Sequence, residues 1–142
     1  MNARVLIVDD EKEFLEVMEE RISVRGMEVA TSMSAKEALT KIENEPFDAI
    51  IMDFQMPGMD GIDALKAIKE KKPELQIILL TGHASVKRGV EAIKEGALDF
   101  MEKPADVDEL TEKIKEARAN KMIVVEKQNK KAVDDVLLRF GF

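Results

Sequence analysis

The chain has 142 residues, enough for one domain with a single hydrophobic core. Its 29 acidic and 22 basic residues give a net charge of −7, which excludes a protein that binds nucleic acid through a basic surface. The absence of cysteine excludes a disulfide framework and a zinc–thiolate site, and no apolar run approaches the ~20 residues that span a bilayer. We therefore expect a soluble cytoplasmic domain.

Short apolar runs, rich in β-branched residues, alternate with longer amphipathic stretches along the chain. The runs predict strands at residues 5–8, 27–31, 49–52, 77–80 and 98–101. The first, third and fourth runs are apolar at every position, as strands covered on both faces must be.

Helices are predicted between the strands, where apolar residues recur every three or four positions. Ser34 and Glu37 have the spacing of a capping box, which starts the second helix. Gly89 falls in the middle of the fourth helix, and we interpret it as a tolerated surface glycine. The apolar residues that mark the other helices are Phe14, Met18 and Ile22 (first), Ile62, Leu65 and Ile68 (third), Val86, Val90 and Ile93 (fourth), and Val107, Leu110, Ile114 and Ala117 (fifth).

Five strands alternating with helices predict an α/β fold with a parallel sheet covered by helices on both faces. We expect a flavodoxin-like, doubly wound sheet with the strand order 2-1-3-4-5. In such sheets function gathers at the carboxyl ends of the strands, beside strands one and three.

Polar residues follow the predicted strands at this edge: Asp9 and Asp10, Asp53, Thr81 and Lys103. An aspartate after a strand is usually a helix cap, and a single lysine or threonine there is usually a surface or turn residue. It is the convergence of all five residues on one edge of the sheet, and not any one of them, that indicates a functional site. Three carboxylates would repel one another unless a hard cation such as Mg²⁺ joined them. With the lysine and the hydroxyl, they suit a phosphoryl group at an aspartate nucleophile.

Four stretches resemble the receiver domain of two-component response regulators, a family that includes the stand-alone chemotaxis regulator. The resemblance covers about residues 3–120, so we expect a receiver domain at 1–120 and a C-terminal helical extension or linker at 121–142. The matching stretches are residues 5–11, 50–61, 79–82 and 96–104.

The resemblance implies a role for each residue that matches a family motif. Asp53 is expected to be the phosphoacceptor, and Asp10 and Asp53 to ligate Mg²⁺ through their side chains. Asp9 is expected to support the metal through its water shell, and Gln55 through its backbone carbonyl. Lys103 is expected to pair with the phosphoryl oxygens.

The resemblance also implies a conformational switch and a special peptide bond. Thr81 is expected to reach for the phosphoryl group, and Phe100 to turn its ring inward when Thr81 moves. The bond between Lys103 and Pro104 is expected to be cis. His83 is expected at the rim of the pocket, where the family tunes phosphoryl loss.

The implied function is a signalling switch that catalyses only its own phosphorylation and dephosphorylation. A sensor histidine kinase or phosphotransfer protein would supply the phosphoryl group, and a downstream protein target or output domain would receive the signal. Direct contact with nucleic acid or a membrane is not expected.

Three other classes compete with this interpretation. An aspartate-nucleophile phosphohydrolase typically carries a second aspartate two residues after the nucleophile, where this chain has Gln55. A flavin- or nucleotide-binding module needs a loop after strand one that cradles phosphate, and Asp9-Asp10-Glu11 would repel it. A degenerate receiver used only as a scaffold would not need Asp53, Thr81 and Lys103.

The C-terminal segment leaves alternatives open. Residues 123–125 could end the fifth helix, break it or form a short strand. The spacing of Val133, Leu137 and Phe140 predicts one more amphipathic helix ending at Gly141. This helix either packs back on its own domain or lies loose, or it mediates homodimerisation or partner docking. Whether the chain is a complete regulator or part of a longer one stays open.

Overall fold

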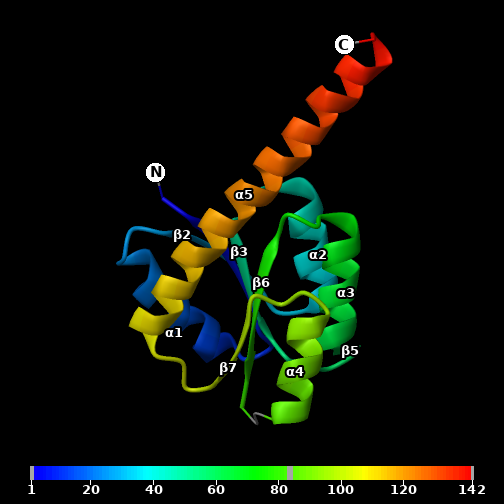
Figure 1. Ribbon diagram of the computed structural model, residues 1–142. Coiled ribbons are helices and arrows are strands. Elements are labelled where there is room, and N and C mark those ends of the chain that lie inside the picture. The colour runs from blue at the N-terminus through cyan, green and yellow to red at the C-terminus, as the bar shows by residue number, and fades with distance from the viewer. Residues whose placement is uncertain (1, 83–84, 142) are drawn as a thin grey trace.

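A computed structural model describes residues 2–82 and 85–141, without the side chain of Met59. Its main sheet has five strands in the order β2-β1-β3-β6-β7, and every adjacent pair is parallel (Figure 1). The predicted order 2-1-3-4-5 is confirmed, with β6 and β7 as the fourth and fifth strands. The strands are β1 (Arg4–Val8), β2 (Glu28–Ser32), β3 (Ala49–Asp53), β6 (Gln76–Thr81) and β7 (Asp99–Glu102).

Helices cover both faces of the sheet. In Figure 1, α1 and α5 lie on one side, and α2, α3 and α4 lie on the other. A hydrophobic core lies on each face of the sheet, between the strands and the helices that cover it. Successive residues of β1 point into these two cores in turn, because side chains alternate across a strand. Thus Leu6 joins the α2–α4 side and Ile7 the α1–α5 side. The helices are α1 (Lys12–Ser23), α2 (Ala35–Asn44), α3 (Gly61–Lys71), α4 (Val86–Lys94) and α5 (Val107–Arg139).

A short antiparallel hairpin of β4 (Gln55–Met56) and β5 (Met59–Asp60) follows β3 and was not predicted. It returns the chain so that the Gly61 N–H donates to the Phe54 carbonyl at 2.9 Å. A Cβ at Gly61 would lie 2.6 Å from that carbonyl oxygen, so only glycine allows this approach. The hairpin therefore holds the loop after Asp53 in a defined path.

The last helix differs from the prediction. α5 runs without interruption for 33 residues, so the separate C-terminal helix was wrong and residues 123–125 are helical. The stretch contains no glycine or proline and is rich in good helix formers. Its last buried residue is Ala117, and the distal part projects from the domain (Figure 1). Among the described residues, no helix is both long and apolar enough to cross a membrane.

The apolar pattern of α4 also has an unexpected role. Val86, Val90 and Ile93 marked the helix correctly, but their exposures are 87%, 49% and 48%. Within α4 only Ala92 is buried. The apolar stripe of α4 therefore faces outward beside β7 and does not fill the core.

Candidate functional site

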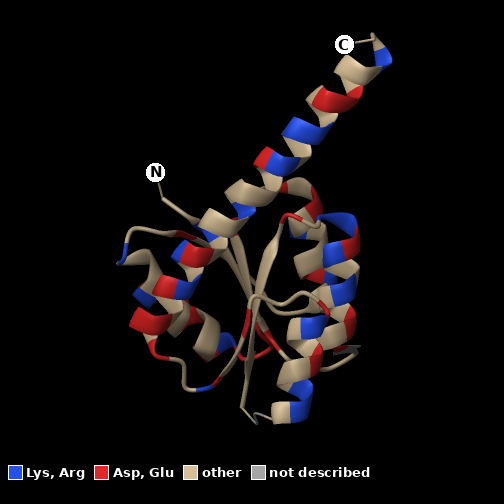
Figure 2. Cartoon of the chain, viewed as in Figure 1, with Lys and Arg blue, Asp and Glu red and all other residues tan. Residues whose placement is uncertain are grey.

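The carboxyl ends of β1 and β3 bring the predicted acidic residues together. Val8 and Met52 are register partners in these adjacent parallel strands, so Asp9 and Asp53 follow side by side. Acidic residues gather at this lower end of the sheet in Figure 2. Asp9, Asp10, Glu11 and Asp53 each offer a carboxylate oxygen, and these oxygens all lie within 4.8 Å of one another.

The chemistry of this cluster fits a hard divalent cation. All of its donors are carboxylate oxygens, which Mg²⁺ prefers. Asp9 and Asp53 are buried, whereas Asp10 and Glu11 are exposed, so an ion here could keep part of its water shell. Glu11 was not predicted as a ligand, although its place directly after Asp10 could have indicated it.

Lys103 lies among these carboxylates. Its Nζ is 2.6 Å from Oδ2 of Asp9, 3.3 Å from Oδ2 of Asp53 and 3.8 Å from Oε1 of Glu11. The Lys103 N–H donates to the Thr81 carbonyl at 2.7 Å, which places the residue directly beside the end of β6. The peptide bond from Lys103 to Pro104 is cis.

The electrostatics follow from burial. Burial raises the pKa of Asp9, and the nearby Asp53 carboxylate adds to this, although hydrogen bonds from Lys103 and the Glu11 N–H oppose it. Burial lowers the pKa of Lys103, but Asp9 and Asp53 outweigh it and raise that pKa overall. The pocket therefore favours a cation, and one ammonium does not fully offset the cost of the buried Asp9 charge.

Backbone amides orient the two buried carboxylates. The Glu11 N–H donates to Oδ1 of Asp9 at 2.8 Å, and the Gln55 N–H donates to Oδ1 of Asp53 at 3.0 Å. Each aspartate thus bonds the amide two residues later, as in an Asx turn. The other oxygen, Oδ2, is the one that faces Lys103 in both cases.

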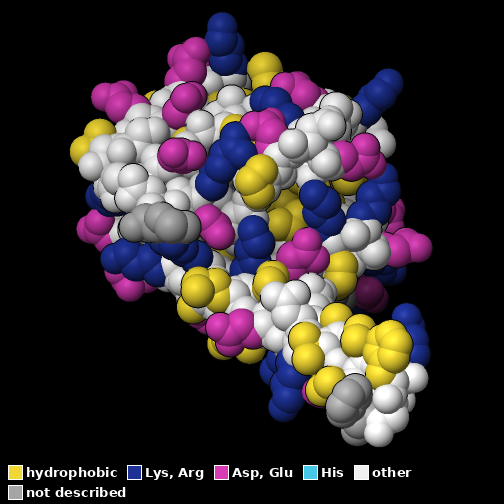
Figure 3. Space-filling view, turned by 90° about the horizontal axis from the view of Figure 1, so that it is seen from above, with side chains coloured by type: hydrophobic (Ala, Val, Ile, Leu, Met, Phe, Trp, Pro, Cys, Tyr) yellow, Lys and Arg dark blue, Asp and Glu magenta, His cyan; other side chains and the backbone are white. Residues whose placement is uncertain are grey.

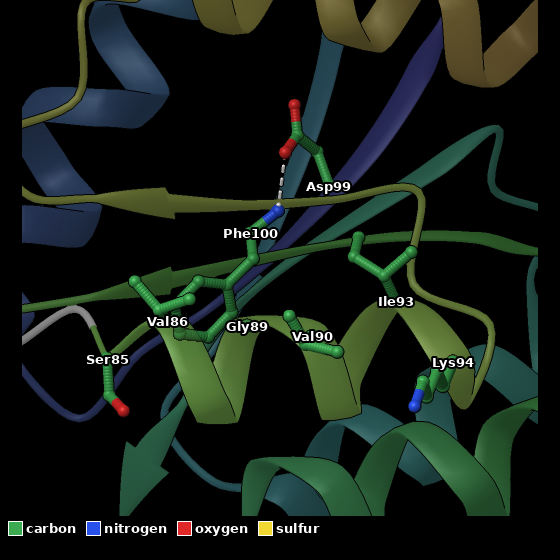
Figure 4. Close-up of a pocket in the computed structure, with 8 residues that line it drawn as sticks. All are labelled: Ser85, Val86, Gly89, Val90, Ile93, Lys94, Asp99 and Phe100. Carbon is green, nitrogen blue, oxygen red and sulfur yellow. Dashed lines mark hydrogen bonds between the residues drawn. The ribbon is translucent and has the colours of Figure 1, made fainter.

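The two predicted switch residues lie on adjacent strands. Thr81 is buried at the end of β6, and Phe100 is half-buried on β7. The Phe100 ring packs edge-to-face on Phe54, with centroids 5.4 Å apart and an interplanar angle of 84°. A Cβ at Gly89 would lie 3.1 Å from Cδ1 of Phe100 (Figure 4). Gly89 is therefore half-buried beside this ring, and a Cβ here would require the ring to move by a few tenths of an ångström. The interpretation of Gly89 as a tolerated glycine stays a prediction.

Arg88 is a residue that sequence reasoning missed. Its guanidinium lies 4.6 Å from the centroid of Phe54 and 2.6 Å from Oδ2 of Asp60. Asp60 also caps α3 by accepting the Ile62 N–H at 2.8 Å. Arg88 thereby connects α4 to the loop that follows Asp53. No sequence signal pairs these residues, and His83, predicted at the pocket rim, lies outside the described residues.

Fold and site together define a class of domain: a doubly wound α/β sheet with an aspartate, an acidic cluster that fits a cation and a lysine at its switch point. The family can be stated as well. Residues 5–115 match the profile described as response regulator receiver domain. The chain belongs to this family of two-component signalling domains.

Several known proteins are similar to the chain. The transcriptional regulatory protein ZraR of Escherichia coli O157:H7 is 35% identical over 123 residues, which cover 87% of this chain and 28% of that protein. The C4-dicarboxylate transport transcriptional regulatory protein DctD of Rhizobium meliloti is 33% identical over 125 residues, which cover 88% and 27%. The chain thus spans little more than a quarter of these curated relatives.

Solved receiver domains share the fold. A receiver domain protein from Clostridium thermocellum has a TM-score of 0.81 and 34% identity, covering 86% of this chain and 98% of that one. The beryllofluoride-activated NtrC4 receiver domain dimer has a TM-score of 0.79 and 37% identity, covering 83% and 98%.

Proposed function

We propose that the chain accepts a phosphoryl group on Asp53 from a phosphohistidine of a sensor histidine kinase or a phosphotransfer protein. The observation that carries this proposal is the Lys103 ammonium, 3.3 Å from the Asp53 carboxylate within a cluster of acidic side chains. A phosphoryl acceptor needs a nucleophile and positive charge at one place. Both are present here.

In the proposed step, an oxygen of the ionised Asp53 carboxylate attacks phosphorus. The new O–P bond forms as the P–N bond to the histidine breaks, and the electron pair of that bond returns to the imidazole nitrogen. No general base is needed, because the carboxylate is already a nucleophile. Lys103 lies where it can neutralise charge on the transferred oxygens.

Mg²⁺ is the proposed cofactor. Asp10 and Asp53 would hold it through side chains, Asp9 through water and Gln55 through its backbone carbonyl. When bound, it supplies charge neutralisation for the phosphoryl oxygens. Gln55 also stands where phosphohydrolases typically carry a proton-donating aspartate, so the domain would process only its own phosphoryl group.

Phosphorylation would then shift the surface formed by α4 and β7. Moving a two-state equilibrium from 1:99 to 99:1 requires about 5.5 kcal/mol of differential interaction. A few new charge-assisted hydrogen bonds, from groups such as Thr81 and Lys103, contribute about 1.5–3 kcal/mol each and together could supply this amount. The Phe100 ring, which contacts both Phe54 and α4, is the proposed link to the surface.

That surface is hollowed and apolar. A cavity of about 610 Å³ lies between α4 and β7 (Figure 4), and its apolar lining is formed by Val86, Val90, Ile93 and Phe100. Exposed apolar patches of this kind mark interaction sites. We assign this surface to a downstream protein target or output domain. With its net charge of −7, the chain itself is not proposed to contact nucleic acid.

The distal part of α5 supports a homodimer. Val133, Val136 and Leu137 of α5 and its C-cap residue Phe140 are all exposed and follow one helix face, since their spacing is i, i+3, i+4 and i+7. Apolar side chains gather at the free end of the helix in Figure 3. A helix segment that projects from its domain gains little stability from its own residues, because most helix stability comes from packing against other elements. Pairing with the same stripe of a second copy would bury these apolar side chains.

Intact mass spectrometry tests the phosphoryl-acceptor function. The chain is incubated with Mg²⁺ and a small acyl phosphate, and we expect the mass to rise by one phosphoryl group. The Asp53→Asn variant keeps the shape of the side chain and is expected to show no gain. An unchanged wild-type mass, or an equal gain in the variant, would contradict the proposal.

A further inference from the structure

An aromatic ring faces the lysine of the proposed phosphoryl site. The Nζ of Lys103 lies 4.3 Å from the centroid of the Phe14 ring, which is well within the range of a cation–π contact. Phe14 lies in the first turn of α1, just after the acidic loop that ends β1. The ammonium is therefore held by carboxylates and also by an aromatic ring.

We propose that Phe14 is a positioning residue that keeps the Lys103 ammonium directed at Asp53 while its charged neighbours change. This inference rests on the proposed function. It concerns how one residue of the site is held in place, and no comparison assigns a role to Phe14.

The carboxylate partners of Lys103 lie at unequal distances from its ammonium. Its shortest contact, 2.6 Å, is to Asp9, and the contact to the phosphoacceptor Asp53 is longer, 3.3 Å. Asp9 belongs to the acidic cluster that fits a cation, so Lys103 and a bound cation would compete for its oxygens. A contact through Asp9 alone would hold Lys103 away from the nucleophile.

The Phe14 ring does not compete in this way. It is uncharged, so binding of a cation or arrival of a phosphoryl group does not remove its attraction for the ammonium. The lysine side chain is long and flexible, and a compact ammonium has no fixed geometry of its own. A second, permanent contact therefore restricts where the charge can go when Asp9 turns to another partner.

The ring is itself well supported. Phe14 is half-buried and packs against the core between the sheet, α1 and α5, whereas the Lys103 side chain is 15% exposed. The low exposure of the Lys103 side chain shows that little of it contacts water. Shielding strengthens both the cation–π contact and the pairing with the carboxylates.

The test compares Phe14→Leu, which keeps apolar packing but removes the ring, with Phe14→Trp, which keeps an aromatic face. The first measurement needs neither metal nor phosphoryl donor. In the wild-type chain the ring current should shift the NMR signals of the Lys103 Cε protons upfield, and the shift should vanish in Phe14→Leu. Absence of this shift in the wild type would overturn the inference.

The second measurement is the rate of phosphorylation by a small acyl phosphate at saturating Mg²⁺. We expect Phe14→Leu to lower the maximal rate about three- to tenfold, with little change in the half-saturating donor concentration. Phe14→Trp should rescue the rate. A Phe14→Leu variant that reacts at the wild-type rate would overturn the positioning role.

A double-mutant cycle separates positioning from general packing. The free energy of unfolding is measured for Phe14→Leu, Lys103→Met and the double variant, all as the full chain. A favourable coupling between the two positions supports the contact, and strict additivity contradicts it. If the wild-type chain accepts no phosphoryl group, the proposed function fails, and the positioning role fails with it.

Discussion

The Lys103 ammonium lies 2.6 Å from Oδ2 of Asp9, a carboxylate that is only 1% exposed. This pair spans the sheet, because Asp9 follows β1 and Lys103 follows β7. Burial, with a smaller contribution from the Asp53 carboxylate, raises the pKa of Asp9, so a nearby cation favours its ionised form. Lys103 and a divalent cation would therefore share the task of neutralising this carboxylate.

Removal of the ammonium tests this dependence. We expect Lys103→Met to lower the free energy of unfolding by about 1–3 kcal/mol without Mg²⁺, since a buried charged acceptor loses its partner. Added Mg²⁺ should recover part of the loss in urea denaturation. Lys115→Met, which removes a surface lysine paired with Glu112, should show no such Mg²⁺-dependent recovery. If Mg²⁺ does not reduce the loss of stability in Lys103→Met, Lys103 and the cation do not share the neutralisation of Asp9.

The acidic cluster predicts unequal roles for its two exposed members. Asp10→Asn should weaken Mg²⁺ binding by at least about tenfold, a loss typical of altered metal sites. Glu11→Gln, the matched change one residue later, should weaken it less, because of these two exposed residues the resemblance assigns direct ligation to Asp10 and not to Glu11. Isothermal titration calorimetry measures both. Unchanged affinity in Asp10→Asn would reject the assignment, and equal losses would make Glu11 a ligand as well.

Asp60 gives a prediction about pH. Burial raises the pKa of Asp60, but hydrogen bonds from the Ile62 N–H and Arg88 outweigh it and hold that pKa below its usual value of 3.8. A lowered carboxyl pKa contributes stability above pH 3.8, and this contribution is lost as the pH falls through the folded-state pKa. The stabilising effect of Asp60 should therefore disappear in acid.

Two variants separate the contributions of Asp60. Asp60→Asn keeps a good helix cap but loses the ion pair, which is partly exposed, so we expect a loss of less than about 1 kcal/mol at neutral pH. This difference from wild type should close in acid. Asp60→Ala also removes the cap and should cost about 1 kcal/mol more. Urea denaturation across the pH range checks both, and a difference that widens in acid would be inconsistent with the ion pair.

Gly89 tests the packing of Phe100. Alanine in a helix is about 1 kcal/mol more favourable than glycine, but a Cβ here would lie 3.1 Å from the ring. We expect Gly89→Ala to give much less than that gain and to shift the NMR signals of Phe100 and Phe54. In a Phe100→Ala background the full gain should return. Full stabilisation in the wild-type background would mean that the ring moves aside freely.

Two adjacent leucines test the homodimer. Leu137 belongs to the apolar stripe of α5 and is 43% exposed, whereas Leu138 is 73% exposed and projects about 100° away around the helix. Leu137→Glu should shift the solution mass toward the monomer in light scattering, and Leu138→Glu should leave it unchanged. A wild-type chain that is monomeric at high concentration would exclude pairing through this stripe.

The sequence alone was sufficient for the sheet and for its functional edge. Apolar runs at each strand and capped amphipathic stretches between them are local patterns. They predicted the number and order of the strands in the main sheet and the meeting of Asp9, Asp53, Thr81 and Lys103 at its edge. The strand boundaries differ slightly from the prediction, since β2 and β7 begin one residue later than predicted. Identification of the family rested on these same residues.

Other features depend on contacts between segments far apart in the chain, which no local pattern encodes. The outward stripe of α4, the ring contact of Gly89, the Arg88–Asp60 pair and the Phe14 ring above Lys103 are all of this kind. Periodicity shows that a helix has an apolar face, but the direction of that face is set by how the helix docks on the sheet. The sequence therefore determined which residues form the site, and only the tertiary structure decided which neighbours hold them.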